Sequence, residues 1–302
     1  MEHQIGLVGL GAMGFPMAKR LLAAGHNLAV VPHTNRKPAD DLADLGATVN
    51  ETVSALASDR DVVIICVPDV PQVEEVLFGA QGLLAGNLSQ DMLVIDMSTI
   101  NPTAARRHNE LLSGHGITAL DAPVSGGPAR AADGTLTIMV GGSNTGFEKA
   151  RPILEKLGKN IIHVGEAGAG QAVKHVNQLM ISIIMIANAE ALTIGVKAGI
   201  PLETMIDVIS TSSGSNYLLQ NWLPKTLFSG DLSGGFALDL LMKDLSAAMR
   251  WAADLGLPSF GGALAQQLYR IAQAEGQGRM DYSTVAKLYE DVAGVELRLT
   301  RE

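Results

Sequence analysis

The sequence predicts an α/β domain followed by an all-α domain, and two observations support this fold class. Through residue 164, short runs rich in Val and Ile alternate with helical patterns, which is typical of a parallel sheet covered by helices on both faces. From residue 165 onward almost every segment has a helical pattern. We therefore expect one domain at 1–164 and a second at 165–302 that begins with a long interdomain helix.

The expected elements follow in order along the chain. Strands are expected at 4–9, 28–31, 62–67, 93–96, 117–121, 136–140 and 161–164. Helices are expected at 12–24, 39–45 and 103–112, and then at 171–198, 202–210, 238–254, 263–275 and 283–292. The most apolar part of the long helix, 179–187, is too short to cross a bilayer, so we expect a buried helix and no membrane partner.

Composition and charge exclude several classes of protein. The chain has 302 residues, of which 47% are hydrophobic and 18% are charged, and this excludes a disordered polar chain. The formal net charge of −9 disfavours nucleic acid as a partner. The single cysteine, Cys66, excludes a disulfide within one chain and a cysteine zinc cluster, and we expect no metal. The acidic Glu2 and the early glycines do not resemble a signal peptide, so we expect a cytoplasmic location.

The strongest local motif is a glycine-rich turn between the first strand and the first helix. It consists of Gly9, Leu10, Gly11, Ala12, Met13 and Gly14. The first glycine permits a tight turn, the second lets a pyrophosphate approach the backbone, and the third lets helix and strand pack closely. The start of the helix then offers unpaired N–H groups to phosphate. The motif predicts dinucleotide binding on a Rossmann-type, doubly wound sheet, and an ordinary glycine-rich turn is the alternative.

The end of the second strand bears on the identity of the cofactor. An acidic residue at this position would bind the ribose hydroxyls of NAD. The segment 30–37 holds no Asp or Glu, whereas Arg36 and Lys37 offer cationic groups to a 2′-phosphate, and Asn35 adjoins them. We therefore favour NADP(H), while NAD(H) stays open. The alternative is a solvated basic turn.

A loop in the middle of the chain suits a small acid. It follows Asp121 and contains Ser125, Gly126 and Gly127. Its hydroxyl and exposed N–H groups are apt for holding a carboxylate. By composition alone, a structural turn is an equally good interpretation.

Polar residues on two of the predicted helices are candidates for chemistry. Lys174 and Asn177 lie three residues apart and share one helix face. A desolvated lysine can exchange a proton with a substrate hydroxyl. A solvent-facing polar pair is the alternative, but the adjoining glycine-rich junction favours a ligand site. Lys243 lies within an apolar helix, where it either extends its ammonium to solvent or reaches a cofactor.

At these positions the sequence resembles the β-hydroxyacid dehydrogenase family, which includes 3-hydroxyisobutyrate dehydrogenase, tartronate semialdehyde reductase and 2-(hydroxymethyl)glutarate dehydrogenase. The resemblance covers essentially the whole chain. Its motifs are the segments 8–26, 96–99, 121–136, 168–178 and 242–245. These motifs are separate and occur in the family's order, so the resemblance is specific.

The resemblance implies reversible hydride transfer between a nicotinamide cofactor and a short β-hydroxyacid or its semialdehyde. Lys174 would be the catalytic proton donor, with Asn177 beside it. Ser125, Gly126 and Gly127 would hold the substrate carboxylate. The helical domain would mediate a homodimer or homotetramer.

The resemblance also implies residues for the cofactor and leaves two alternatives. Thr99 and Lys243 would contact the cofactor, and Val67 and Pro68 would border its pocket. One alternative is an imine-reducing enzyme on the same scaffold, and the other is a non-catalytic dinucleotide-binding module. The presence of Lys174 argues against both, because members of those two groups usually lack that lysine.

Overall fold

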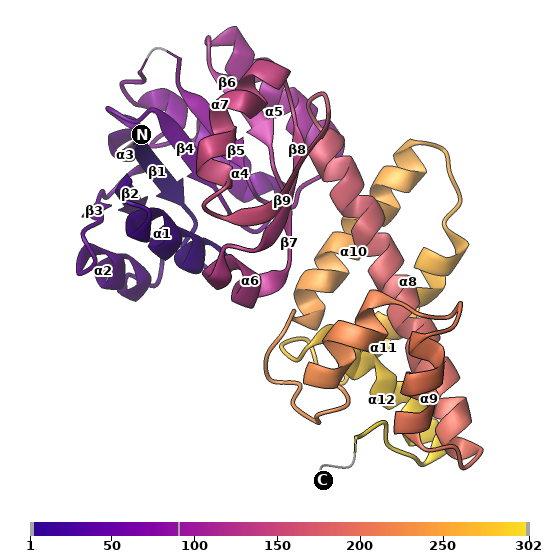
Figure 1. Ribbon diagram of the computed structural model, residues 1–302. Coiled ribbons are helices and arrows are strands. Elements are labelled where there is room, and N and C mark those ends of the chain that lie inside the picture. Colours follow the sequence, from indigo (N-terminus) through magenta and orange to yellow (C-terminus); the bar gives the residue numbers. More distant parts are fainter. Residues whose placement is uncertain (1–2, 90, 300–302) are drawn as a thin grey trace. The chain divides into compact units, whose positions relative to one another are not determined.

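The computed structural model describes residues 3–89 and 91–299 (Figure 1). By its internal contacts the chain divides after Lys174 into two compact units. The domain boundary expected after residue 164 stays a prediction. Each unit is described by itself below.

The first unit is built on one sheet, with helices along it (Figure 1). Its strands are β1 (Gln4–Val8), β2 (Asn27–Val31), β3 (Thr48–Val49), β4 (Val62–Ile65), β5 (Leu93–Asp96), β6 (Thr118–Asp121), β7 (Val124–Ser125), β8 (Leu136–Gly141) and β9 (Gly158–Gly165). Its helices are α1 (Gly14–Ala23), α2 (Lys37–Ala43), α3 (Val53–Ala57), α4 (Val70–Phe78), the 3-10 turn η1 (Leu83–Ala85), α5 (Pro102–Gly114), α6 (Gly127–Asp133) and α7 (Asn144–Leu154). The strand order is β3-β2-β1-β4-β5-β6-β8-β7, and β9 also pairs with β8.

The sheet is covered on both faces, as the sequence predicts. Val62 and Ile64 of β4 belong to one buried core, whereas Val63 and Ile65 belong to the other. Successive side chains of a strand point to opposite faces, so a continuous apolar run such as β4 requires two cores. The carboxyl ends of β1, β2, β4, β5 and β6 lie at one edge, because these strands pair in parallel.

The expectation of a parallel sheet is wrong at β8. This strand runs antiparallel to both β6 and β7. After β6 the chain first forms β7, and α6 then turns it back, so β8 pairs antiparallel with β7 and with β6.

Several elements depart from the expected ranges. The elements that the sequence did not predict are short or contain glycine or proline. They are β3, α3, α4, β7, α6 and α7. Helix α1 begins at Gly14 and not at Ala12, because the preceding residues form a turn. The single helix expected at 283–292 is a 3-10 turn followed by a short helix.

The second unit is helical within the described residues. It comprises most of α8 (Ala169–Lys197), α9 (Leu202–Ser210), the π-helical turn η2 (Leu218–Trp222), the 3-10 turn η3 (Leu223–Lys225), α10 (Leu238–Asp254), α11 (Phe260–Ala274), the 3-10 turn η4 (Tyr282–Ala286) and α12 (Lys287–Ala293). Tyr269, Tyr282 and Phe228 are the largest side chains of its buried core. Helix α8 confirms the long helix predicted from the sequence.

The apolar part of helix α8 extends beyond residues 179–187. By length and composition alone it is able to cross a membrane, since its most apolar window has a mean hydropathy of 1.9. The expectation that this stretch is too short is therefore wrong, because apolar residues continue beyond 179–187. Only 39% of that window is buried, which also departs from the expected buried helix. Core helices of soluble proteins pass the same test, so this single helix is weak evidence for a membrane span.

Candidate active site

The glycine-rich turn after β1 has the shape that the sequence predicts. Gly9 has a φ of 103°, and a Cβ there would collide with the carbonyl oxygen of Cys66. A Cβ on Gly14 would collide with the carbonyl oxygen of Gly9, so only glycine lets α1 pack this closely on the turn. By contrast, no atom lies within 4 Å of a Cβ built on Gly11. Leu10 and Met13 are half-buried beside the turn and Ala12 is exposed.

The segment after β2 contains a cluster of ion pairs. The Arg36 guanidinium donates to both carboxylate oxygens of Glu51, at 3.1 and 2.8 Å. Its Nε lies 3.3 Å from Asp40. These hydrogen bonds lower the pKa of Glu51 and raise that of Arg36. Lys37 pairs with Asp41 one helical turn away.

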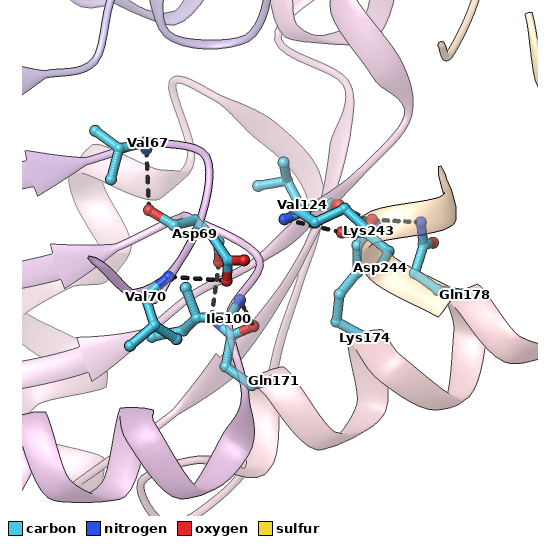
Figure 2. A network of polar contacts seen from close by, with 11 residues as sticks. Val67, Asp69, Val70, Ile100, Val124, Gln171, Lys174, Gln178, Lys243 and Asp244 are labelled. Carbon is cyan, nitrogen blue, oxygen red and sulfur yellow. Dashed lines mark hydrogen bonds and ion pairs between the residues drawn. The ribbon is translucent and has the colours of Figure 1, made fainter. Parts of the chain in front are cut away.

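The start of α8 brings two separated motifs together within the first unit. Lys174 is buried, and its Nζ donates to the carbonyl oxygen of Val124 at 2.8 Å (Figure 2). Val124 directly precedes Ser125, which pairs with Thr137 in the β7–β8 ladder. The ammonium of Lys174 is therefore fixed beside the loop that the sequence predicts to hold a carboxylate.

That loop has a backbone that favours glycine. Gly126 and Gly127 have φ values of 136° and 70°. Both values lie in the region that side chains other than hydrogen rarely adopt. A Cβ on Gly126 would also meet the aliphatic stem of Arg130. The two glycines thus let the chain turn sharply from β7 into α6, with Ser125 at the turn.

Gln171, one turn before Lys174, is fully buried and joins α8 to the loop after β5. Its Nε2 donates to the carbonyl oxygen of Ser98 at 2.7 Å, and its Oε1 accepts from the N–H of Ile100 at 3.1 Å (Figure 2). Thr99, the residue between these two partners, is half-buried. Gln171 therefore fixes Thr99 and the helix of Lys174 relative to each other.

Asp121, at the end of β6, caps the start of α8. Its two carboxylate oxygens accept from the N–H groups of Gly168 at 2.7 Å and Gln171 at 2.9 Å. Burial raises the pKa of Asp121, although these backbone hydrogen bonds oppose the effect. The cap satisfies N–H groups that a helix start leaves without intrahelical partners.

The segment after β4 is tied to the same loop. The N–H of Val67 donates to the hydroxyl of Ser98 at 3.0 Å (Figure 2). Ser98 in turn donates its own N–H to Asp96 at 2.9 Å. Pro68 follows Val67 and is exposed. The predicted cofactor residues Val67, Pro68 and Thr99 therefore lie on two connected loops of the first unit.

The remaining predicted residues, Asn177 and Lys243, lie in the second unit and are linked there by two residues that the sequence analysis missed. Asn177 donates to Gln178 at 3.1 Å. Gln178 donates to Asp244 at 2.8 Å (Figure 2). The ammonium of Lys243 lies 3.0 Å from the other oxygen of Asp244. Asp244 is buried and receives a charged partner, which is what a buried carboxylate requires.

The residues that the sequence analysis missed carried only weak signals. Gln171 and Gln178 lie on the same helix as Lys174, three residues before it and four residues after it, so they belong to neighbouring turns. Asp244 directly follows Lys243 inside an apolar helix, where an ion pair is a natural explanation for both charges. Glu51 gave no local signal, because it reaches Arg36 only through the pairing of β3 with β2.

The glycine-rich turn fits a dinucleotide. The open space beside Gly11 leaves room for a pyrophosphate against the backbone, and α1 begins three residues later. The cationic fork of Arg36 stands beyond β2, where the adenosine ribose lies in Rossmann-type domains. No group of three or more His, Cys, Asp or Glu side chains suited to a metal occurs among residues 3–89 and 91–299.

Two family models match the chain. Residues 4–165 match the NAD-binding domain of 6-phosphogluconate dehydrogenase. Residues 168–289 match the NAD-binding region of NADP-dependent 3-hydroxyisobutyrate dehydrogenase. Together the two models cover most of the sequence.

Curated proteins and solved structures agree with these models. A 2-(hydroxymethyl)glutarate dehydrogenase from Eubacterium barkeri is 40% identical, and the match covers 97% of each chain. An NAD-dependent L-serine dehydrogenase from Pseudomonas aeruginosa is 39% identical, covering 96% of this chain and 99% of the relative. The structure of a Mycobacterium tuberculosis 3-hydroxyisobutyrate dehydrogenase with L-serine has a TM-score of 0.88 at 34% identity, covering 95% of this chain and 99% of the other.

More distant structures show the fold alone. An imine reductase from Myxococcus stipitatus is 21% identical with a TM-score of 0.64, covering 96% of this chain and 99% of the other. The relatives of higher identity are dehydrogenases that match over nearly their full length. The chain therefore belongs to the β-hydroxyacid dehydrogenase family of NAD(P)-dependent oxidoreductases.

Proposed function

We propose that this enzyme reduces a short semialdehyde acid with NADPH and oxidises the corresponding β-hydroxyacid in the reverse direction. The substrate is of the tartronate semialdehyde, 3-hydroxyisobutyrate or 2-(hydroxymethyl)glutarate type. The observation that carries this proposal is the hydrogen bond from Lys174 to Val124, because it fixes an ammonium group at the start of a loop suited to a carboxylate. The names of the relatives support the same substrate class.

In the first unit, one loop binds the substrate and Lys174 transfers the proton. The hydroxyl of Ser125 and the N–H groups of Gly126 and Gly127 hold the substrate carboxylate. Lys174 stabilises the negative charge that develops on the carbonyl oxygen and donates a proton to it. Such general acid catalysis typically contributes about 10²–10⁴-fold to the rate. In the oxidative direction the amine of Lys174 accepts the proton of the hydroxyl.

The remaining roles follow from the resemblance to the family. Asn177, one turn beyond Lys174 on α8, holds the substrate oxygen. The bound nicotinamide cofactor supplies the hydride from C4 of its ring. The segment Gly9–Gly14 holds the pyrophosphate. Thr99 contacts the cofactor near the nicotinamide ribose, and Val67 and Pro68 border the cofactor pocket. Lys243 is proposed as a further cofactor contact.

The preference for NADP(H) forms part of the proposal. It rests on Arg36, with Asn35 beside it, because a guanidinium fork matches the geometry of a 2′-phosphate. The names of the relatives include both cofactors, so they support NAD(P) without favouring either. The ratio of kcat/KM with NADPH to kcat/KM with NADH measures the preference directly.

The test is the initial rate of NADPH and NADH oxidation with the semialdehydes of tartronate, methylmalonate and succinate and with 2-formylglutarate. The proposal predicts strong turnover with one of these acids and a higher kcat/KM with NADPH. Absence of turnover with every semialdehyde would contradict the proposed substrate class. A clearly higher kcat/KM with NADH would contradict the cofactor preference alone.

We also propose a homodimer or homotetramer located in the cytoplasm. The support for association is an apolar surface on the second unit, where Phe260, Ile194 and Leu264 are 83%, 64% and 61% exposed. A groove of about 370 Å³ lies on the same surface between α8 and α11. Exposed apolar areas of this kind typically mark association sites. A monomeric mass by light scattering would contradict the oligomer, and cell fractionation tests the location.

A further inference from the structure

The ion pair between Arg36 and Glu51 occupies the position where the two nicotinamide cofactors differ chemically. The pair is bidentate, with both terminal nitrogens of the guanidinium engaged by one carboxylate. Both side chains are accessible, at 51% and 70% exposure. Because both side chains are exposed, water and salt screen the pair, and it exchanges its partners more readily than a buried pair does.

The backbone places Glu51 at the carboxyl end of β2. Thr48 and Val49 of β3 pair with Ala29 and Val30 of β2. The N–H of Asn50 then donates to the carbonyl oxygen of Val30 at 2.9 Å. Glu51 is the next residue and so follows the end of β2 in space. The acidic residue that the sequence lacks after β2 is thus supplied from the neighbouring strand.

NADP and NAD require different hydrogen-bond partners beside the Arg36–Glu51 pair. The 2′-phosphate of NADP is an anion that a guanidinium fork binds through two parallel hydrogen bonds. Glu51 holds that fork and repels the phosphate. The 2′-hydroxyl of NAD is a hydrogen-bond donor, for which the carboxylate of Glu51 is an acceptor. Asp40 lies 3.3 Å from Nε of Arg36 and thereby helps to orient the guanidinium.

We propose that the Arg36–Glu51 pair sets the cofactor preference. Arg36 leaves Glu51 to bind the 2′-phosphate of NADP(H), and Glu51 limits this preference by competing for the same fork. With NAD(H), the pair stays intact and Glu51 accepts the 2′-hydroxyl. The inference rests on the proposed dinucleotide site and names the residue that restrains its selectivity.

The test measures cofactor binding to the full chain without substrate. NADPH and NADH are titrated separately by their nicotinamide fluorescence, which gives a Kd for each. The variants are Glu51→Gln and Arg36→Gln, with Glu148→Gln as the matched control. Glu148 is an exposed carboxylate whose cation partner is Arg151, so its loss changes the net charge equally without freeing a cation beside the cofactor.

We expect Glu51→Gln to lower the Kd for NADPH about fivefold and to raise the Kd for NADH about twofold, which is the scale of single exposed charge interactions. Arg36→Gln should raise the Kd for NADPH about tenfold and leave the Kd for NADH within about twofold, as expected for the loss of a charge-assisted bidentate contact. Glu148→Gln should shift both values equally and by less than about twofold.

Equal shifts for both cofactors in Glu51→Gln would overturn the inference and leave the pair as a structural link between β3 and α2. The same holds if Glu51→Gln and Glu148→Gln behave alike. These outcomes differ from a failure of the proposed function. A chain that binds NADPH with the expected shifts but reduces no semialdehyde would sustain the inference and contradict the proposed substrate. Melting temperatures of the variants confirm that all of them are folded.

Discussion

Two corners of the sheet edge in the first unit differ in how their side chains are held. The first corner is the start of α8, and the second corner is the end of β2. At the start of α8, Lys174 and Gln171 are buried and bonded to backbone groups of distant loops. At the end of β2, Arg36 and Glu51 are exposed and bonded only to side chains. Hydrogen bonds from buried side chains to backbone fix one geometry, whereas exposed ion pairs exchange partners with water, salt and ligands.

The difference matches what each corner has to do. Proton transfer requires an ammonium at one position relative to the reacting oxygen, and small displacements are costly. Recognition of a 2′-substituent takes place far from the reacting atoms and tolerates alternative partners. The first corner is therefore expected to be sensitive to substitution and insensitive to salt, and the second corner the reverse.

The largest effect is expected at the buried corner. Lys174→Ala should lower kcat by about 10²–10⁴-fold, because it removes the proton donor, while the Kd for NADPH stays within about twofold. Steady-state rates and fluorescence titration measure the two quantities. Lys197→Ala, at the opposite end of the same helix, serves as the control and should retain its turnover. Near-normal turnover of Lys174→Ala would contradict the assignment.

Gln171 tests whether the position of Lys174 matters as much as its presence. Gln171→Ala removes the ties to Ser98 and Ile100 but leaves the ammonium in place. We expect kcat to fall about 10- to 100-fold through misplacement, with a smaller change in the KM for the semialdehyde. Gln171→Glu keeps the acceptor for Ile100 but sets a carboxylate oxygen against the carbonyl oxygen of Ser98, so it should not restore the wild-type kcat. If Gln171→Ala loses stability but keeps its kcat per folded molecule, its role is structural only.

Salt concentration should affect the two corners differently in the wild-type chain. Raising the NaCl concentration from about 0.05 to about 0.5 M shortens the range of charge interactions at exposed groups. The Kd for NADPH should rise about three- to tenfold, whereas kcat at saturating substrates should change less than about twofold. Arg36→Gln should reduce the salt dependence of NADPH binding. Equal salt dependence of kcat and of the Kd for NADPH would contradict the expected difference between the two corners.

The smallest effect concerns Asp121 and pH. Burial raises the pKa of Asp121 above its ordinary value of 3.8, so the folded chain binds more protons there than the unfolded chain. Its contribution to the free energy of unfolding is therefore full below pH 3.8 and is lost as the pH rises through the raised pKa. Asp121→Asn lacks this dependence. Urea unfolding between pH 4 and pH 7 should show the difference, wild type minus variant, falling with pH, and a rise would contradict it.

The sequence predicts the first corner better than the second. The motif Gly9–Gly14 and the long helix are local patterns, and both are confirmed as structural elements. Lys174 and Ser125 belong to separate motifs, and their proximity was implied only by the resemblance to a family. The contacts that hold them, such as Asp121 with Gly168 across 47 residues, follow from the order of strands and not from periodicity.

The end of β2 was predicted only in part for a similar reason. The absence of an acidic residue after β2 is evident in the sequence, but the arrival of Glu51 depends on the two-residue strand β3. A strand this short has no detectable alternation of apolar and polar residues. The antiparallel β8 was missed likewise, because the Val- and Ile-rich pattern of a buried strand does not encode its direction.

The most direct measurement of the central claim follows deuterium from the cofactor to the product. The wild-type chain is supplied with a semialdehyde that it turns over and with NADPH that carries deuterium at both C4 positions of the dihydronicotinamide, and the product is analysed by NMR. Hydride transfer beside Lys174 predicts a β-hydroxyacid with deuterium on the former aldehyde carbon. A hydroxyacid without deuterium at that carbon, or consumption of NADPH without a hydroxyacid, would contradict it.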